Sequence, residues 1–200
     1  TSPGYSAPFP SYNVTFQIPF DLRIFFAVNI KNSTAVPSNA ATQVQNALIN
    51  AFAGDDGGSK ASIGAVLYAA RYVSDITSLG SWAQVISLQI GSANTPIASF
   101  TGSAGGTSLH VTALVSGTLG AGNFLVSGTA FSGTAAYAVG TTIVSQVSGT
   151  AGGVGFYTLS QPNTLPSQTA SAVTANQNLV SVQINQEPSL SNLDIGLTLT

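Results

Sequence analysis

Side chains able to do acid–base or nucleophilic chemistry are scarce in this chain. Four Lys or Arg, six Asp or Glu and one His are present among 200 residues, and there is no cysteine. General acid–base catalysis and glycoside hydrolysis usually need two facing carboxyl groups, but only Asp55 and Asp56 are neighbours. They lie in an Asp-Asp-Gly-Gly segment typical of a turn, without the alternating acidic spacing of an EF-hand. We therefore predict a turn rather than a catalytic or metal site, and no cofactor.

His110 is the only histidine and would have to be the base of any nucleophilic triad. Alternation along its strand-like run puts Leu109 and Val111 on one face and His110 on the other, which predicts a solvated side chain. No acidic residue lies within 34 positions of it, and the serines do not form a Gly-x-Ser-x-Gly elbow. We therefore predict no catalytic residue and no enzyme activity.

Stacking on a sugar ring is the binding chemistry that the aromatic residues suggest. Phe156 and Tyr157 are adjacent, so they point to opposite faces of their strand. We expect Tyr157 to be the exposed one and, with His110, to be a candidate glycan contact. The competing interpretation is that these aromatics anchor a small β core. The segment Gly102 to Gly106 has no lysine to hold a phosphate and is predicted to be a turn.

Composition excludes several other classes of function. The hydrophobic fraction of 44% allows a folded core, whereas the net charge of −2 does not suit nucleic-acid binding. Apolar runs are too short for a membrane span, and the absence of cysteine excludes a disulfide scaffold. Trp82 is expected in the core, and Arg71 on the solvated side of a helix.

The elements that would position these residues follow from the period of the apolar side chains. Alternation predicts a hairpin of two strands, and spacing of three and four predicts two helices, the first ended by Gly54. The predicted elements are a hairpin of 12–18 and 22–30 turning at 19–21, helices over 39–54 and 63–73, and strands over 82–90, 180–184 and 193–199.

The glycine-rich stretch between these elements differs from them in composition and contains repeated segments. Leu-Val-Ser-Gly-Thr occurs at 114–118 and again at 125–129, and short β-favouring runs are separated by glycine turns. We predict an α+β fold, in which one antiparallel or mixed sheet is covered by two helices and carries a small all-β barrel or sandwich. Residues 1–97 and 174–200 would form a discontinuous domain, and 98–173 the inserted domain.

Several of these segments resemble the carboxy-terminal part of baseplate J-like proteins, over residues 12–97 and 176–200. Family members are wedge components of contractile phage tails and related injection devices, and the inserted module departs from the shorter members. The segments that carry the resemblance are Tyr12-Asn13-Val14-Thr15-Phe16, Phe26-Ala27-Val28-Asn29-Ile30-Lys31, the helix over 39–54, the Asp-Gly-Gly loop, Ile63-Gly64, Leu79-Gly80, the strand over 85–90, Asn185-Gln186-Glu187-Pro188 and Asp194-Ile195-Gly196-Leu197.

The resemblance implies a structural subunit of the phage tail baseplate, made in the host cytoplasm and located in the virion. Its partners would be other baseplate and tail subunits, by self-association or hetero-oligomerisation, with no nucleic acid and no membrane span. The scarcity of charge suits interfaces that bury polar but uncharged groups. The alternative is a carbohydrate-binding module for a host surface glycan, contacted by Tyr157 and His110. A polysaccharide-degrading enzyme is disfavoured, because 76–186 contains no carboxylate.

Overall fold

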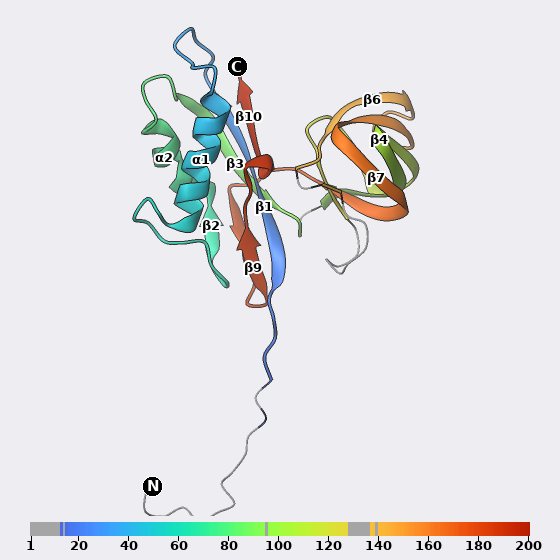
Figure 1. The fold of residues 1–200 in the computed structure, drawn as a ribbon, viewed down its shortest axis with the longest axis horizontal. Coiled ribbons are helices and arrows are strands. Elements are labelled where there is room, and N and C mark those ends of the chain that lie inside the picture. Colours follow the sequence, from blue (N-terminus) through green and yellow to red (C-terminus); the bar gives the residue numbers. More distant parts are fainter. Residues whose placement is uncertain (1–12, 14, 95, 128–136, 139) are drawn as a thin grey trace, which may run out of the picture.

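The computed structural model describes residues 13, 15–94, 96–127, 137–138 and 140–200 (Figure 1). Strands account for 50% of the described residues and helices of all kinds for 15%. The elements in chain order are β1 (Phe20–Ile30), α1 (Ala40–Ala53), β2 (Val66–Tyr68), the 3-10 turn η1 (Ala69–Tyr72), α2 (Val73–Thr77), β3 (Val85–Ser92), β4 (Pro96–Gly117), β5 (Phe124–Ser127), β6 (Ile143–Gly149), β7 (Gly155–Val173), β8 (Leu179–Ser181), β9 (Gln186–Ser189), η2 (Asn192–Asp194) and β10 (Ile195–Leu199).

The predicted fold class is wrong, because the chain is mostly β and its strands form several sheets. It is not an α+β sheet covered by two helices with an inserted domain. The second predicted helix, 63–73, accounts for part of the error. Gly64 has a φ of 75°, Val66 to Tyr68 pair with β8, and the helical residues that follow comprise η1 and a five-residue α2. A helix of so few residues is only marginally stable on its own. Pairing with β8, a strand from the distant C-terminal part, therefore decides the structure of 66–68.

The predicted N-terminal hairpin is also wrong. Tyr12 and Val14 lie outside the described residues, and the proposed turn at 19–21 runs into β1 instead. The neighbours of β1 come from far along the chain: β3 pairs with it in antiparallel, and β9 and β10 pair with it in parallel. β9 lies beside residues 20–23 and β10 beside 26–30, with η2 between them.

β1 is buried on both faces over most of its length. One face, which includes Leu22, Ile24 and Phe26, packs into the cluster that contains α1 and α2. The other face presents Phe25, whose ring lies 4.8 Å from that of Phe124 in β5. In Figure 1 the helices lie on one side of this sheet, and the sheet of β4, β5, β6 and β7 lies on the other.

The first predicted helix is confirmed as α1, ended by Gly54 with a φ of 84°. Val44, Leu48, Ala51 and Phe52 are buried in the cluster against β1. This spacing of three and four places an apolar stripe on one side of the helix. The predicted strand over 82–90 is confirmed in β3, although Trp82 precedes it and is half-buried against the same cluster.

Two long strands, β4 and β7, dominate the glycine-rich stretch. Their register runs from Pro96 opposite Val173 to Val111 opposite Gly155, with β5 and β6 also pairing to β7. The predicted short runs, 109–115, 124–126, 141–147 and 156–159, lie on these four strands, except that 141 and 142 precede β6. Residues 160–173 were not predicted as a strand. Gly102 to Gly106, predicted as a turn, lies inside β4. The domain boundaries at 98 and 173 stay a prediction.

β4 bends until its two ends meet, and glycine permits the approach. A Cβ on Gly102 would lie 2.8 Å from the carbonyl oxygen of His110, and one on Gly117 would overlap the carbonyl oxygen of Ile97. The bend encloses a second cluster around Phe100, Leu109 and Tyr157.

Replacing Gly117 by alanine tests whether this closure holds the β4–β7 sheet together. Gly117 has a φ of 74° and no room for a Cβ, whereas Gly106 in the same strand has a φ of 59° and open space around it. We expect Gly117→Ala to lower the free energy of unfolding by roughly 2–4 kcal/mol, and Gly106→Ala by only about 1 kcal/mol. Urea unfolding followed by circular dichroism measures both, and equal losses would contradict the close approach.

Candidate functional site

The predicted orientation of the aromatic pair at 156 and 157 is inverted. Tyr157 is 1% exposed and belongs to the core, while Phe156 is 43% exposed. The Tyr157 hydroxyl donates a 2.6 Å hydrogen bond to the carbonyl oxygen of Gly153, and burial raises the pKa of this phenol. Alternation put the two rings on opposite faces, as expected, but it does not tell which face is inside. Tyr157 is therefore not available to a sugar in this structure.

His110 is exposed, as predicted, and is paired with Phe156. The two rings are stacked, with centroids 4.3 Å apart and planes 5° apart. The residues are opposite one another on β4 and β7, and Ser148 of β6 lies opposite Phe156 on its other side. The exposed aromatic surface of the β4–β7 sheet is thus formed by His110 and Phe156, on strands that backbone pairing holds in place.

The Asp55-Asp56 segment is a turn, as predicted, and a cation from another element holds it. Asp56 accepts hydrogen bonds from the backbone N–H of Gly58 at 3.0 Å and from Nη2 of Arg71 at 3.1 Å. These two groups lower the pKa of Asp56, so the stabilisation that they supply is lost when the pH falls through that lowered value. Arg71 also donates to the carbonyl oxygen of Ser59, so it closes a loop rather than simply facing solvent.

Three carboxyl groups lie near this turn. Asp55, Asp56 and Asp75 line a hollow of about 410 Å³ beside α1. Burial first, and then the negative charge of Asp56, raises the pKa of Asp75. Among the residues that the structure describes, no group of three or more His, Cys, Asp or Glu side chains is placed to hold a metal ion. Arg71 already supplies the positive charge that faces Asp56.

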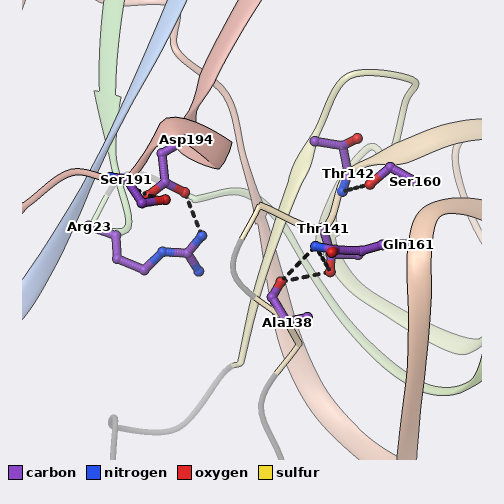
Figure 2. A network of polar contacts seen from close by, with 8 residues as sticks. All are labelled: Arg23, Ala138, Thr141, Thr142, Ser160, Gln161, Ser191 and Asp194. Carbon is purple, nitrogen blue, oxygen red and sulfur yellow. Dashed lines mark hydrogen bonds and ion pairs between the residues drawn. The ribbon is translucent and has the colours of Figure 1, made fainter. Parts of the chain in front are cut away.

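A buried ion pair joins β1 to η2. Nη2 of Arg23 donates to Oδ1 of Asp194 at 2.7 Å, with both side chains almost fully buried (Figure 2). The other carboxylate oxygen of Asp194 accepts hydrogen bonds from the backbone N–H and the hydroxyl of Ser191, which completes a capping box. The Arg23 guanidinium also lies 5.1 Å from the centre of the Phe25 ring. The pair therefore fixes the bend of the chain between β9 and β10.

A second polar cluster supports the β4–β7 sheet where it approaches η2. The side-chain amide of Asn163 donates to the Thr141 hydroxyl at 3.2 Å, and its oxygen accepts from the backbone N–H of Ala138 at 2.8 Å. Thr141 donates in turn to the carbonyl oxygen of Ala138 at 2.7 Å. Figure 2 shows Thr141, Gln161 and Ala138 of this cluster near the Arg23–Asp194 pair. These groups satisfy one another and serve structure.

Large apolar side chains are exposed at one end of the β1 sheet. Phe16 is 83% exposed, Ile18 84% and Phe20 55%, and they share one face of an extended segment. Ile184, 88% exposed, lies in the neighbouring turn, where the carbonyl oxygen of Asn185 accepts a 2.8 Å hydrogen bond from the Phe20 N–H. We call these four residues the apolar tip. Apolar side chains exposed together, rather than singly, mark a contact surface.

The sequence interpretation missed the apolar tip and the buried ion pair. Phe16 and Ile18 were assigned to a paired strand, which hid their exposure. One feature of the sequence pointed to the local structure around Asp194. Ser191 followed three residues later by an acidic side chain resembles a capping box. Nothing in the sequence linked Asp194 to Arg23, which is 171 positions away.

Comparison of the chain with protein-family models, with curated proteins and with solved structures finds no match. Among the described residues, none of the helices has the length and apolar character needed to cross a membrane.

Replacing Asp194 by asparagine tests the buried ion pair. The change leaves the Arg23 guanidinium buried without a counter-ion, so we expect the free energy of unfolding to fall by roughly 3–5 kcal/mol. Asp56→Asn is the matched control, because its pair with Arg71 is partly open to solvent and should matter much less. Urea unfolding at neutral pH measures both variants. Equal losses would show that the Arg23–Asp194 pair does not hold this part of the fold.

Proposed function

We propose that the chain is a structural subunit of a phage tail baseplate, a wedge component of a contractile injection system that acts through protein–protein contacts. It would reside in the virion and contact other baseplate and tail subunits. The apolar tip is the observation that carries the proposal, because Phe16, Ile18 and Ile184 are each more than four-fifths exposed. The sequence resemblance to baseplate J-like proteins supports the particular setting.

The energetics of the apolar tip favour an assembled state. Fully burying a large apolar side chain is worth about 1.5–3 kcal/mol, so covering several of them offsets much of the entropy lost on association. No charged residue precedes Asp21 in the sequence, so a partner would not have to desolvate a charge along Phe16 to Phe20.

Four charged side chains and the histidine make contacts within the fold, which supports an assembly role. Arg23 and Asp194 join two strands, and Arg71 and Asp56 close a loop. His110 stacks on Phe156 on the surface of the β4–β7 sheet.

Purified particles of the phage that encodes the chain test this function. We expect mass spectrometry to find the chain in gradient-purified particles, and an electron-microscopy map to place it in the baseplate. A soluble, non-virion protein from the same lysate is the control and should be removed by the purification. If the chain is removed along with it, the baseplate proposal is wrong.

The exposed stack of His110 on Phe156 favours a second candidate function, in which the β4–β7 sheet binds a host surface glycan. Aromatic rings held rigidly at a surface offer an apolar face to a sugar at little entropic cost. The residues that carry this candidate are His110 and Phe156, in place of the predicted Tyr157.

A glycan array tests the second candidate. If the stack binds a sugar, we expect saturable binding that Phe156→Ala reduces at least about tenfold, because the platform for the ring is lost. Val147→Ala, next to Ser148 on β6, is the control, because it removes exposed apolar surface and leaves both rings in the sequence. A blank array, or equal losses in the two variants, would count against a glycan site at this stack.

A further inference from the structure

Residues 15–20, which we call the arm, are an extended segment without a cover of their own. β9 reaches only as far as Phe20, and no described hydrogen bond involves the backbone of residues 15–19. The side chains of Phe16, Ile18 and Phe20 alternate with Thr15 and Gln17, as in a strand with one apolar face. Figure 1 shows the chain leaving the sheet here and running away from it. The arm therefore has the pattern of a half-buried strand and lacks the surface that would bury it.

The chain carries an apolar groove at the same end of the β1 sheet. It has a volume of about 570 Å³ and lies between the end of α1, the 60–63 loop and β9. Ile49, Phe52, Ile63 and Leu190 are among its walls, and Lys60 and Glu187 are the charged residues in its lining. A cavity of this size accommodates several apolar side chains, and the uncharged arm would bring no further charge into it.

The arm cannot reach the groove of its own molecule without reversing direction. β9 runs parallel to β1 and begins opposite Phe20, so groove residues 187–190 lie beside the strand that follows the arm. The arm continues the opposite way and stays extended. A second molecule that meets the first end to end, with its arm antiparallel, brings that arm alongside β9 and toward the groove.

We propose that two copies of this chain exchange their arms, each inserting Phe16 and Ile18 into the groove of the other. The arm and the groove lie at one end of the molecule, joined by the pairing of β9 with residues 20–23. This arrangement lets one two-fold axis satisfy both contacts, so the assembly closes as a dimer and does not grow as a filament. The exchange shares Phe16 and Ile18 with the baseplate proposal, but the two are tested separately, because a dimer in solution does not depend on finding the chain in particles.

Side-chain insertion, rather than extension of the sheet, is the contact that the edge of β9 permits. Asn185 accepts the hydrogen bond from Phe20, so the backbone groups of Glu187 and Ser189 also point to β1. Those of Pro188, a buried residue, point to the other edge of β9. Proline has no N–H, which blocks a regular ladder at this point. The affinity should then depend on the apolar side chains of the arm more than on its backbone.

The experiment is the molar mass of the full chain in solution, measured by light scattering across a concentration series. We expect the wild-type chain to reach twice its 20.1 kDa and no more. The double variant Phe16→Asp/Ile18→Asp should raise the dimer dissociation constant at least about 100-fold, because charges cannot enter the groove. Thr15→Asp/Gln17→Asp adds the same two charges to the opposite face of the arm and should leave most of the dimer intact.

A mixing experiment identifies the groove as the receptor. Ile63→Asp puts a charge in the groove at a partly exposed position, so the fold should survive and the dimer should weaken. Mixing this variant with the arm variant should give heterodimers that keep one intact contact, which neither variant forms alone. A wild-type chain that stays monomeric up to about 0.5 mM overturns the proposal. So do equal effects of the two arm variants, failure of the mixture to associate, or an arm that binds only a different subunit.

Discussion

β1 has to bury both of its faces, and this constraint arranges the rest of the molecule. Its even-numbered apolar residues, Leu22 to Ile30, need a cover on one side, which α1 and the short helical turns near α2 supply. Phe25 and Ala27 need a cover on the other side, and Phe124, Val126 and Val173 of the β4–β7 sheet provide it. α1 and α2 precede β3 in the sequence, whereas β5 and β7 follow it. Removing either cover would expose a large apolar area of β1.

The same constraint explains where the few charges lie. Arg23 belongs to the face of β1 opposite the helices and would be stranded there without Asp194, which η2 brings to it from the C-terminal part. Elsewhere the chain uses uncharged polar groups, such as Asn163 and Thr141, for its buried hydrogen bonds. Neutral groups cost less to desolvate than charges do, so a long stretch without ionisable residues can still form a packed sheet. The composition therefore reflects how the molecule is packed as much as what it binds.

Local signals were predictable from the sequence, and long-range pairing was not. α1 with Gly54 and the strand within β3 follow from periods that a few neighbouring residues set. The hairpin at 19–21 was inferred from Pro19, but the partners of β1 lie more than 50 residues away, and the pattern contains no trace of them. His110 was placed correctly because its neighbours fixed the face, whereas for Phe156 and Tyr157 the inner face depends on the fold of the whole sheet. The fold class failed for the same reason, since half of the described residues are strands joined across long distances.

The edges of the β1 sheet differ in how they meet solvent. The backbone of Pro188 in β9 is directed away from β1, and a proline has no N–H for another strand to pair with there. The arm, a few residues away, shows the opposite treatment: no charge, no pairing and three large apolar side chains on one face. If the sequence only had to avoid unwanted strand pairing, proline or charged residues would be expected in the arm as well as at the edge of β9. A blocked edge beside an unpaired apolar arm favours a contact that buries side chains rather than one that pairs backbones. Specificity then comes from the shape of the surface that receives Phe16 and Ile18.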